Sequence, residues 1–127
     1  MNKTIGMFLG ALGTMVSLSS AAAPCSPERG QKIFESKCAM CHSAKKEAGH
    51  LVGPNLSSVL GRGVGKAANF NYSPALASAT DTWDEKTLDA FLKAPAATRP
   101  GTTMPFSGIK NDQDRGAVTC FLKTQTQ

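Results

Sequence analysis

The pentapeptide Cys38-Ala39-Met40-Cys41-His42 constrains this chain more than any other feature, because its three reactive side chains must reach one bound group. In the pattern C-x-x-C-H, two thiols add across the vinyl groups of a haem, and the adjacent histidine ligates the iron. Two intervening residues on a helical turn let both sulfur atoms reach one edge of the porphyrin. We therefore interpret Cys38 and Cys41 as attachment points for one covalent haem c, and His42 as an axial iron ligand.

Two other interpretations of the paired cysteines find less support. A thioredoxin-like redox pair needs a βαβ context, and no strand pattern precedes Cys38. A zinc site needs a second pair of ligands at suitable spacing, which the sequence does not offer.

The N-terminus predicts a cleaved secretory signal peptide over residues 1–22. Lys3 gives a positive start, residues 5–18 form an apolar run, and residues 19–23 are small. The run is shorter than the ~20 residues of a spanning helix, although an uncleaved membrane anchor is the alternative. A cut directly before Pro24 is unfavourable, so we expect cleavage after Ala22. The mature protein is then expected in the periplasm, without stable membrane insertion.

Residues 23–127 are expected to form one domain. Without Lys3, 13 of the 14 basic residues remain beside 9 acidic ones, a net charge of +4. No basic cluster is denser than Lys45-Lys46, so acidic proteins are more fitting partners than nucleic acid. The apolar content is modest, and a buried haem would supply much of the missing apolar surface.

Local signals predict an all-α fold of short helices joined by long loops. Ser26-Pro27-Glu28 combines an N-cap, a proline at the first helical position and an acid in the first turn, so a helix should run from there to Cys38. Ser73-Pro74 repeats the cap and proline before a short helix. The segment 49–71 is rich in Gly and Asn and predicts a loop.

Two further helices are expected in the C-terminal half. Thr82-Trp83-Asp84-Glu85 has the form of a capping box, and the helix after it should stop before Pro95. Asn111 or Asp112 should cap the last helix. The expected apolar faces of these two helices are Leu88, Phe91 and Leu92 on the first, and Val118, Phe121 and Leu122 on the second.

A second axial ligand can be sought by elimination. Three of the five methionines leave with the signal peptide, and Met40 lies inside the attachment loop, whose ends are tied to the haem edge. Met104 remains, in a loop stiffened by Pro100 and Pro105. The alternatives are a gap-filling core role for Met104 and a bis-histidine haem ligated by His50.

The chain from Glu28 to Lys123 resembles the class I cytochromes c, the mitochondrial type and its bacterial periplasmic relatives. The resemblance rests on these stretches: Gly30-Gln31-Lys32-Ile33-Phe34, Cys38 to His42, Gly53-Pro54-Asn55-Leu56, Gly61-Arg62, Trp83, Pro100-Gly101-Thr102-Thr103-Met104 and Phe121-Leu122-Lys123. It implies a small fold around one covalent haem c, in which Gly30 and Phe34 cross Val118 and Phe121.

The resemblance also implies roles for single residues. His42 and Met104 would be the axial ligands, and the carbonyl of Pro54 would accept a hydrogen bond from the His42 imidazole. The residues implied to contact the buried propionate are Arg62, Tyr72, Trp83 and Thr102. The docking rim around the exposed haem edge would keep only Lys32, Lys37, Lys93 and Lys110. In place of the other lysines common in the family stand Leu51, Ala96, Ala97 and Thr103.

Two interior residues differ from the family pattern, and one pair of cysteines is left without a role in haem attachment. Phe91 stands where the family often has a tyrosine, and Leu76 where it often has an asparagine, so the Met104 side should be less polar.

Cys25 and Cys120 remain after haem attachment, in an oxidising compartment. Because the family fold brings the start of the first helix near the last helix, we expect them to form a disulfide, with two unpaired thiols as the alternative.

The leading functional hypothesis is a monomeric, soluble periplasmic one-electron carrier, not an enzyme. With both axial positions filled by His42 and Met104, no position is open for substrate or dioxygen. It would shuttle between a redox enzyme or membrane complex and an oxidase or reductase. The alternatives are a peroxidase-like haem enzyme or ligand sensor with a displaceable Met104, and a dedicated acceptor for one dehydrogenase.

Overall fold

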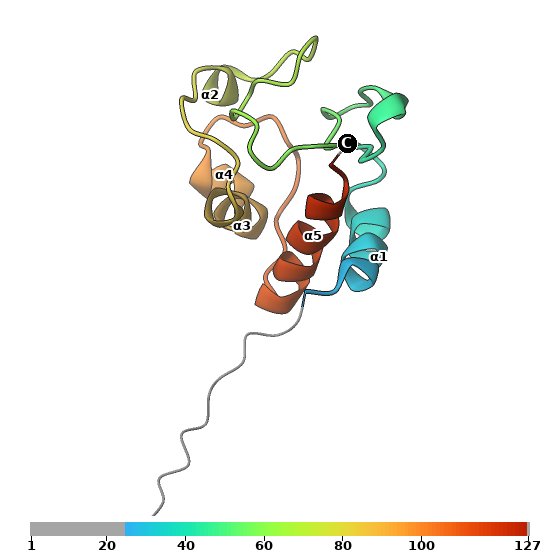
Figure 1. Ribbon diagram of the computed structural model, residues 1–127. Helices are drawn as coiled ribbons and strands as arrows, with labels where there is room; N and C mark the ends of the chain where they lie inside the picture. Colours follow the sequence, from blue (N-terminus) through green and yellow to red (C-terminus); the bar gives the residue numbers. More distant parts are fainter. Residues whose placement is uncertain (1–24, 127) are drawn as a thin grey trace, which may run out of the picture.

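Short helices and connecting loops account for the backbone of the computed structural model, which describes residues 25–126 (Figure 1). In chain order they are α1 (Pro27–Lys37), the 3-10 helix η1 (Lys46–Ala48), α2 (Pro74–Ala77), α3 (Glu85–Lys93), α4 (Pro95–Thr98) and α5 (Asp112–Thr124). Within the described residues, extended pairing is limited to an isolated antiparallel bridge between Gly63 and Thr82. The all-α prediction is confirmed. The predicted signal peptide, residues 1–22, lies outside the described residues.

The helix α1 begins and ends as the sequence predicts. Ser26 is its N-cap, and the Ser26 hydroxyl accepts a hydrogen bond from the backbone N–H of Arg29 at 3.4 Å. At the other end, the N–H of Cys38 donates to the carbonyl of Phe34 at 2.8 Å. This helix therefore leads directly into the C-x-x-C-H motif.

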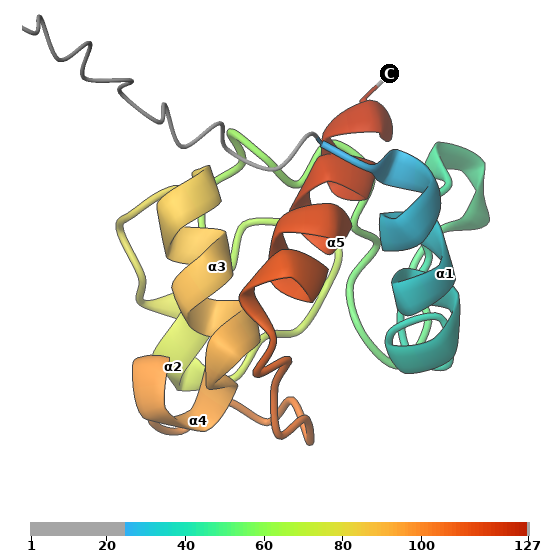
Figure 2. The same ribbon diagram turned by 90° about the horizontal axis from the view of Figure 1, so that it is seen from below.

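The helices α1 and α5 pack across one another (Figure 2). At Gly30 the helices come so close that an added Cβ would lie 1.9 Å from the carbonyl oxygen of Ala117. Next to this crossing, the rings of Phe34 and Phe121 lie 5.3 Å apart, and Val118 is almost fully buried. The crossing of residues 30 and 34 against 118 and 121 is confirmed.

The helix α3 buries the apolar face that its sequence predicts, Leu88, Phe91 and Leu92. Its start differs from the prediction, since Asp84 is the N-cap and accepts a hydrogen bond from the N–H of Thr87 at 2.6 Å. Thr82 instead belongs to the isolated bridge. Pro95 follows the end of α3, as expected, but also opens the short α4, which was not predicted.

The loops between η1 and α3, together with α2, close the end of the molecule opposite the start of α5, as Figure 1 shows. The segment 49–71 contains no helix, as predicted. In residues 25–126, none of the helices is long and apolar enough to cross a membrane. Between α1, α3, α5 and these loops lies a pocket, whose walls carry the residues that the sequence singled out.

Candidate haem site

One large pocket gathers residues from the whole length of the described chain. Its empty volume, counted out to the open mouth, is about 1050 Å³. Apolar side chains from α1, α3 and α5 form its floor. The residues proposed from the sequence that line it are Cys38, Cys41, His42, Pro54, Arg62, Tyr72, Trp83, Thr102 and Met104. Residues separated by more than sixty positions therefore meet around one space.

The attachment motif forms a turn that continues from α1. The N–H groups of Cys41 and His42 both donate to the carbonyl of Cys38, at 3.0 and 2.9 Å. The turn places both cysteines in the pocket wall. Burial raises the pKa of the Cys38 thiol to about 11, against the opposing charge of Lys37. The thiol is therefore protonated at neutral pH in the free chain.

Two neighbours fix the imidazole of His42, which is largely buried. Its Nδ1–H donates to the carbonyl of Pro54 at 2.7 Å, which leaves Nε2 as the lone-pair donor. Burial lowers the pKa of His42, and the Pro54 hydrogen bond opposes that shift. A Cβ at Gly53 would lie 2.3 Å from Cε1 of the ring, so only glycine leaves the imidazole this space. No role for Gly53 was predicted from the sequence, although its place directly before Pro54 was a signal.

The candidates for the second axial ligand lie in different surroundings. Met104 lines the pocket, and its N–H donates to the Thr102 hydroxyl at 3.3 Å. His50 is not among the lining residues. Its Nε2–H donates to the carbonyl of Ala68 at 2.8 Å, and its Nδ1 accepts from the N–H of Asn55 at 3.0 Å. The side chain of Met40 is 90% exposed and also lies outside the pocket wall.

Two buried polar atoms in the pocket wall have no hydrogen-bond partner among the described residues: Nε of Arg62 and the hydroxyl of Ser73. The Nη2 of Arg62 is held by the carbonyl of Asn55 at 3.0 Å. Buried donors of this kind need a partner. An otherwise apolar pocket with two such donors suits a haem, whose ring is apolar and whose propionates accept hydrogen bonds. The cofactor therefore fits these residues.

Ser73 is a residue that the sequence analysis missed for this site. The pattern Ser73-Pro74 indicated only a helix N-cap. In the structure, the Ser73 side chain makes no capping hydrogen bond and is turned into the pocket wall instead. Nothing in the sequence of the short α2 indicated that the Ser73 hydroxyl would lack a capping partner.

The remaining predicted contacts line the same pocket. The hydroxyl of Tyr72 accepts a hydrogen bond from the N–H of Ala67 at 3.3 Å. Trp83 is buried, and its ring lies 5.1 Å from that of Phe91. Phe91 and Leu76, the two interior departures expected from the sequence, are both buried in the pocket wall, where their side chains are apolar.

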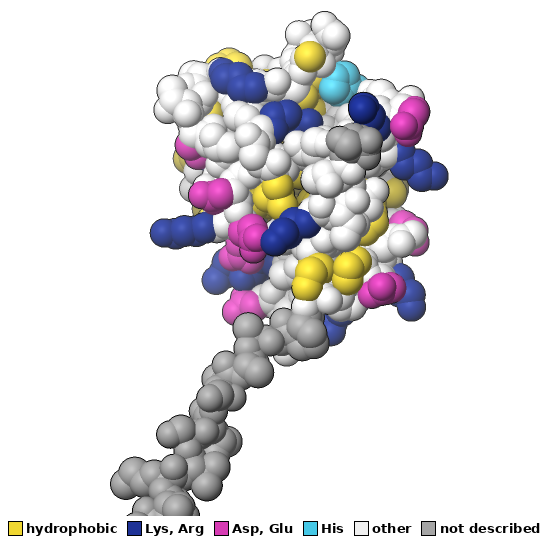
Figure 3. Space-filling model, in the orientation of Figure 1, with side chains coloured by type: hydrophobic (Ala, Val, Ile, Leu, Met, Phe, Trp, Pro, Cys, Tyr) yellow, Lys and Arg dark blue, Asp and Glu magenta, His cyan; other side chains and the backbone are white. Residues whose placement is uncertain are grey.

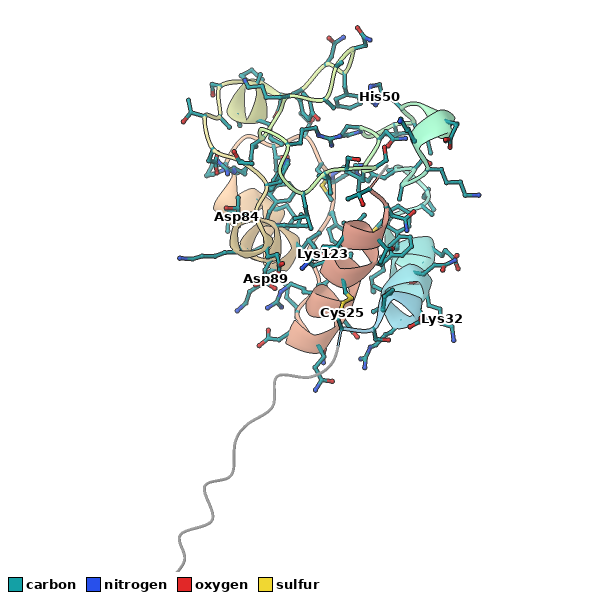
Figure 4. The ribbon with its side chains drawn as sticks, viewed as in Figure 1. Cys25, Lys32, His50, Asp84, Asp89 and Lys123 are labelled. Atoms are coloured by element: carbon teal, nitrogen blue, oxygen red, sulfur yellow. A yellow bond between two sulfur atoms is a disulfide. The ribbon has the colours of Figure 1, made fainter. Side chains whose placement is uncertain are left out.

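The predicted rim lysines are all exposed, but they come from separate elements. Lys32 and Lys37 are on α1, and Figure 4 shows Lys32 pointing outward from that helix. Lys93 ends α3, and the Nζ of Lys110 donates to the carbonyls of Lys93 and Ser107 at 2.8 and 2.9 Å. None of the four lines the pocket.

The face of α5 seen in Figure 3 carries both signs of charge. Lys123 pairs with Glu85 at 2.6 Å, and the buried guanidinium of Arg115 pairs with Asp89 at 2.8 Å. Figure 4 labels Lys123 and Asp89 on this side. Because its charges are paired, this face offers no field of a single sign.

The second pair of cysteines is brought together near the start of α1. Cys25 lies against Cys120 of α5 (Figure 4), and their Cα atoms are 5.7 Å apart. This separation is the one that a disulfide spans.

Comparisons with known proteins agree with this geometry. A family profile described as "Cytochrome c" matches residues 27–126. Cytochrome c of the alga Ulva intestinalis is 44% identical over 105 residues, 83% of this chain and 95% of the relative. Cytochrome c2 of the bacterium Rhodomicrobium vannielii is 43% identical over 111 residues, 87% of this chain and 88% of the relative. The chain therefore belongs to the cytochrome c family, as a haem c protein that carries electrons and is not an enzyme.

Proposed function

We propose that this electron carrier works in the periplasm, where it shuttles single electrons between a redox enzyme or membrane complex and an oxidase or reductase. The observation that carries the proposal is that His42 and Met104 line the same pocket as Cys38 and Cys41. In this arrangement His42 and Met104 would hold the iron, and Cys38 and Cys41 would attach the porphyrin. No position on the metal would then be left for a substrate.

The residues of the pocket have distinct tasks in this function. Haem c supplies a reversible one-electron iron couple when bound. Cys38 and Cys41 hold the group covalently, and Nε2 of His42 is the nitrogen left free for the metal. The thioether of Met104 is a soft donor that favours ferrous iron, and the apolar wall disfavours additional charge. Both effects raise the reduction potential.

The polar part of the wall is proposed to hold the propionates. Arg62 and Ser73 offer the buried donor atoms described above, Nε and Oγ. Tyr72, Trp83 and Thr102 line the same pocket. Charge-assisted hydrogen bonds from a buried guanidinium are among the stronger polar contacts in proteins. Arg62 should therefore be the main propionate partner.

The compartment is argued from the N-terminus and the cysteines. Residues 1–22 have the composition of a cleaved signal peptide. A Cys25–Cys120 disulfide, which we propose from the 5.7 Å separation of the Cα atoms, persists in an oxidising compartment. The name cytochrome c2, which a bacterial relative carries, adds to this argument.

The partners are proposed to be redox proteins with acidic docking surfaces, which this chain meets as a monomer. Lys32, Lys37, Lys93 and Lys110 are exposed and would form the docking rim. A positive rim raises the rate of encounter with a negative surface and does so less at high salt.

A redox titration of the purified holoprotein tests the proposal. The expected result is a reversible one-electron transition, with no carbon monoxide bound by the ferrous form and no peroxidase turnover. Carbon monoxide binding at the native pH, or turnover with hydrogen peroxide, would favour the alternative of an enzyme or sensor with a displaceable Met104. Cell fractionation of the native strain tests the periplasmic location separately.

A further inference from the structure

An ion pair joins the turn before Met104 to the segment that contains Trp83. Arg99 directly follows α4, and its Nη2 donates a hydrogen bond to the carboxylate of Asp81, 18 positions earlier in the chain. The guanidinium carbon of Arg99 also lies 5.9 Å from the centre of the Trp83 ring. Arg99 therefore has two partners in one segment, a carboxylate and an aromatic ring.

The guanidinium of Arg99 is less exposed than that of an ordinary surface ion pair. The Arg99 side chain is 20% exposed, whereas that of Arg29, which pairs with Asp114, is 50% exposed. The Nε atom of Arg99 is buried and has no hydrogen-bond partner among the described residues. Water weakens exposed ion pairs, and an aromatic face adds its own attraction for a cation. Arg99 is therefore held more firmly than Arg29.

Two hydrogen bonds connect the backbone of Arg99 to Met104. The carbonyl of Arg99 accepts from the N–H of Thr102 at 3.0 Å, and the hydroxyl of Thr102 accepts from the N–H of Met104 at 3.3 Å. Gly101, with a φ of 90°, lets the chain reverse between them. The place of Arg99 therefore fixes the start of a turn whose end carries the thioether.

The segment that holds Arg99 is itself fastened to the pocket wall. The carbonyl of Asp81 accepts a hydrogen bond from the N–H of Val64 at 2.9 Å, and the N–H of Trp83 donates to the carbonyl of Arg62 at 2.9 Å. Trp83 is 6% exposed and lines the pocket. The ion pair thus ties the Met104 turn to a fixed part of the wall.

We propose, on the basis of the Met104 ligation argued above, that Arg99 is a positioning residue for Met104: its contacts with Asp81 and Trp83 keep the turn closed and the thioether on the iron. We name Arg99, Asp81 and Trp83 the Arg99 clasp. An outside ligand can reach a six-coordinate iron only when the turn opens. The apparent affinity for such a ligand is reduced by the small fraction of the open form, which the clasp keeps low.

The test is a titration of the ferric holoprotein with imidazole, followed by the loss of the thioether-to-iron charge-transfer band. Arg99→Met removes the charge and the hydrogen-bond donors but keeps a long side chain beside Trp83. It should bind imidazole about tenfold more tightly than the wild type, since a partly buried pair and its ring contact are lost. Arg99→Lys, which keeps the charge, should restore part of the wild-type resistance.

Three further variants separate the clasp from charge and from global stability. Arg29→Met breaks the exposed pair with Asp114 and should leave the imidazole affinity unchanged. Gly30→Ala weakens the crossing of α1 and α5 and should also leave it unchanged. Asp81→Asn should act in the direction of Arg99→Met. The double variant Arg99→Met/Asp81→Asn should bind imidazole no more tightly than Arg99→Met alone, because the two residues act as a pair.

Each adverse result has a distinct meaning. A wild type without the charge-transfer band would reject Met104 as the ligand, and the clasp with it. With the band present, equal imidazole affinities of Arg99→Met and Arg29→Met would reject the clasp alone. A lower reduction potential of Arg99→Met at unchanged affinity would show that Arg99 acts only through its charge, which also rejects the clasp. If Arg99→Met yields no holoprotein, Asp81→Asn decides, and its wild-type affinity would overturn the proposal.

Discussion

At the scale of single residues, the site depends on how the chain holds His42. The Pro54 carbonyl takes the Nδ1 proton, and Gly53 leaves the ring its space. The C-x-x-C-H motif indicated His42 and the two cysteines directly, since residues so close together on one turn must bind the same haem. Ser73 was not predictable, because Ser before Pro is equally typical of an N-cap, and only tertiary packing turned it toward the pocket.

Met104→Ala should leave the haem attached, because attachment needs Cys38, Cys41 and His42 but not Met104. Loss of the thioether should lower the reduction potential and allow the ferrous protein to bind carbon monoxide. Potentiometry and optical titration measure both changes. If the variant kept the potential and the spectrum of the wild type, Met104 would not be a ligand, and His50 would have to be considered.

Asp81→Asn should make the free energy of unfolding less dependent on acid pH. Arg99 donates a hydrogen bond to Asp81, and this lowers the pKa of the carboxyl from its ordinary value of 3.8. Because the pKa of Asp81 is lower in the folded state, the ionised carboxylate stabilises the folded protein above pH 3.8. This stabilisation is lost as the pH falls through the folded-state pKa.

Denaturant unfolding of wild type and Asp81→Asn across this pH range makes the comparison. The variant should be less stable at pH 7 and converge with the wild type in acid. Glu47→Gln, at an exposed position of η1, is the control for loss of one charge. A difference between Asp81→Asn and wild type that persisted unchanged to the lowest pH would contradict the account.

At the scale of elements, the sequence predicted the helices whose signals are local. The caps of α1 and α5 and the buried face of α3 are as expected. The helix α4 was missed, because Pro95 both ends one helix and suits the first position of the next. The start of α3 was placed too early, since Thr82 and Asp84 are both good N-caps and the bridge to Gly63 occupies Thr82.

Gly30→Ala tests the crossing of α1 and α5. An added Cβ would lie 1.9 Å from the carbonyl oxygen of Ala117, so the helices must move apart. We expect a loss of a few kcal/mol in the free energy of unfolding, of the size that overpacking causes. Gly116→Ala on α5 is the matched control, because an added Cβ there meets nothing within 4 Å.

The control should stabilise the protein by about 0.5–1 kcal/mol, since alanine is the better helix former. Chemical denaturation measures both variants. Equal stability of Gly30→Ala and Gly116→Ala would mean that the close approach of the two helices carries no energetic weight.

At the scale of the whole molecule, the sequence alone could not show that residues 42, 62, 73 and 104 share one pocket. These residues span more than sixty positions and lie in the loops between the helices, so only the folded chain brings them to one pocket. The resemblance to the class I cytochromes c implied most of them. It could not indicate how far the side chains of Met40 and Val52 are exposed.

Cys25→Ala tests the proposed disulfide, which would close a loop across a sequence separation of 95 residues. The loss of this link should lower the free energy of unfolding by about 4 kcal/mol in the chain-entropy model. Cys25 is exposed, so the substitution itself removes little packing. The control is wild-type protein in which the proposed disulfide has been reduced to thiols. Its free energy of unfolding should match that of the variant. Two titratable thiols in the unreduced, denatured wild type would exclude the disulfide.

The most direct test of the central claim, a covalent haem held by His42 and Met104, is the optical spectrum of the purified ferric holoprotein. Coordination by Met104 predicts a thioether-to-iron charge-transfer band, lost in Met104→Ala and kept in His50→Ala. A spectrum without this band in the wild type, or a band that survives in Met104→Ala, would contradict the account.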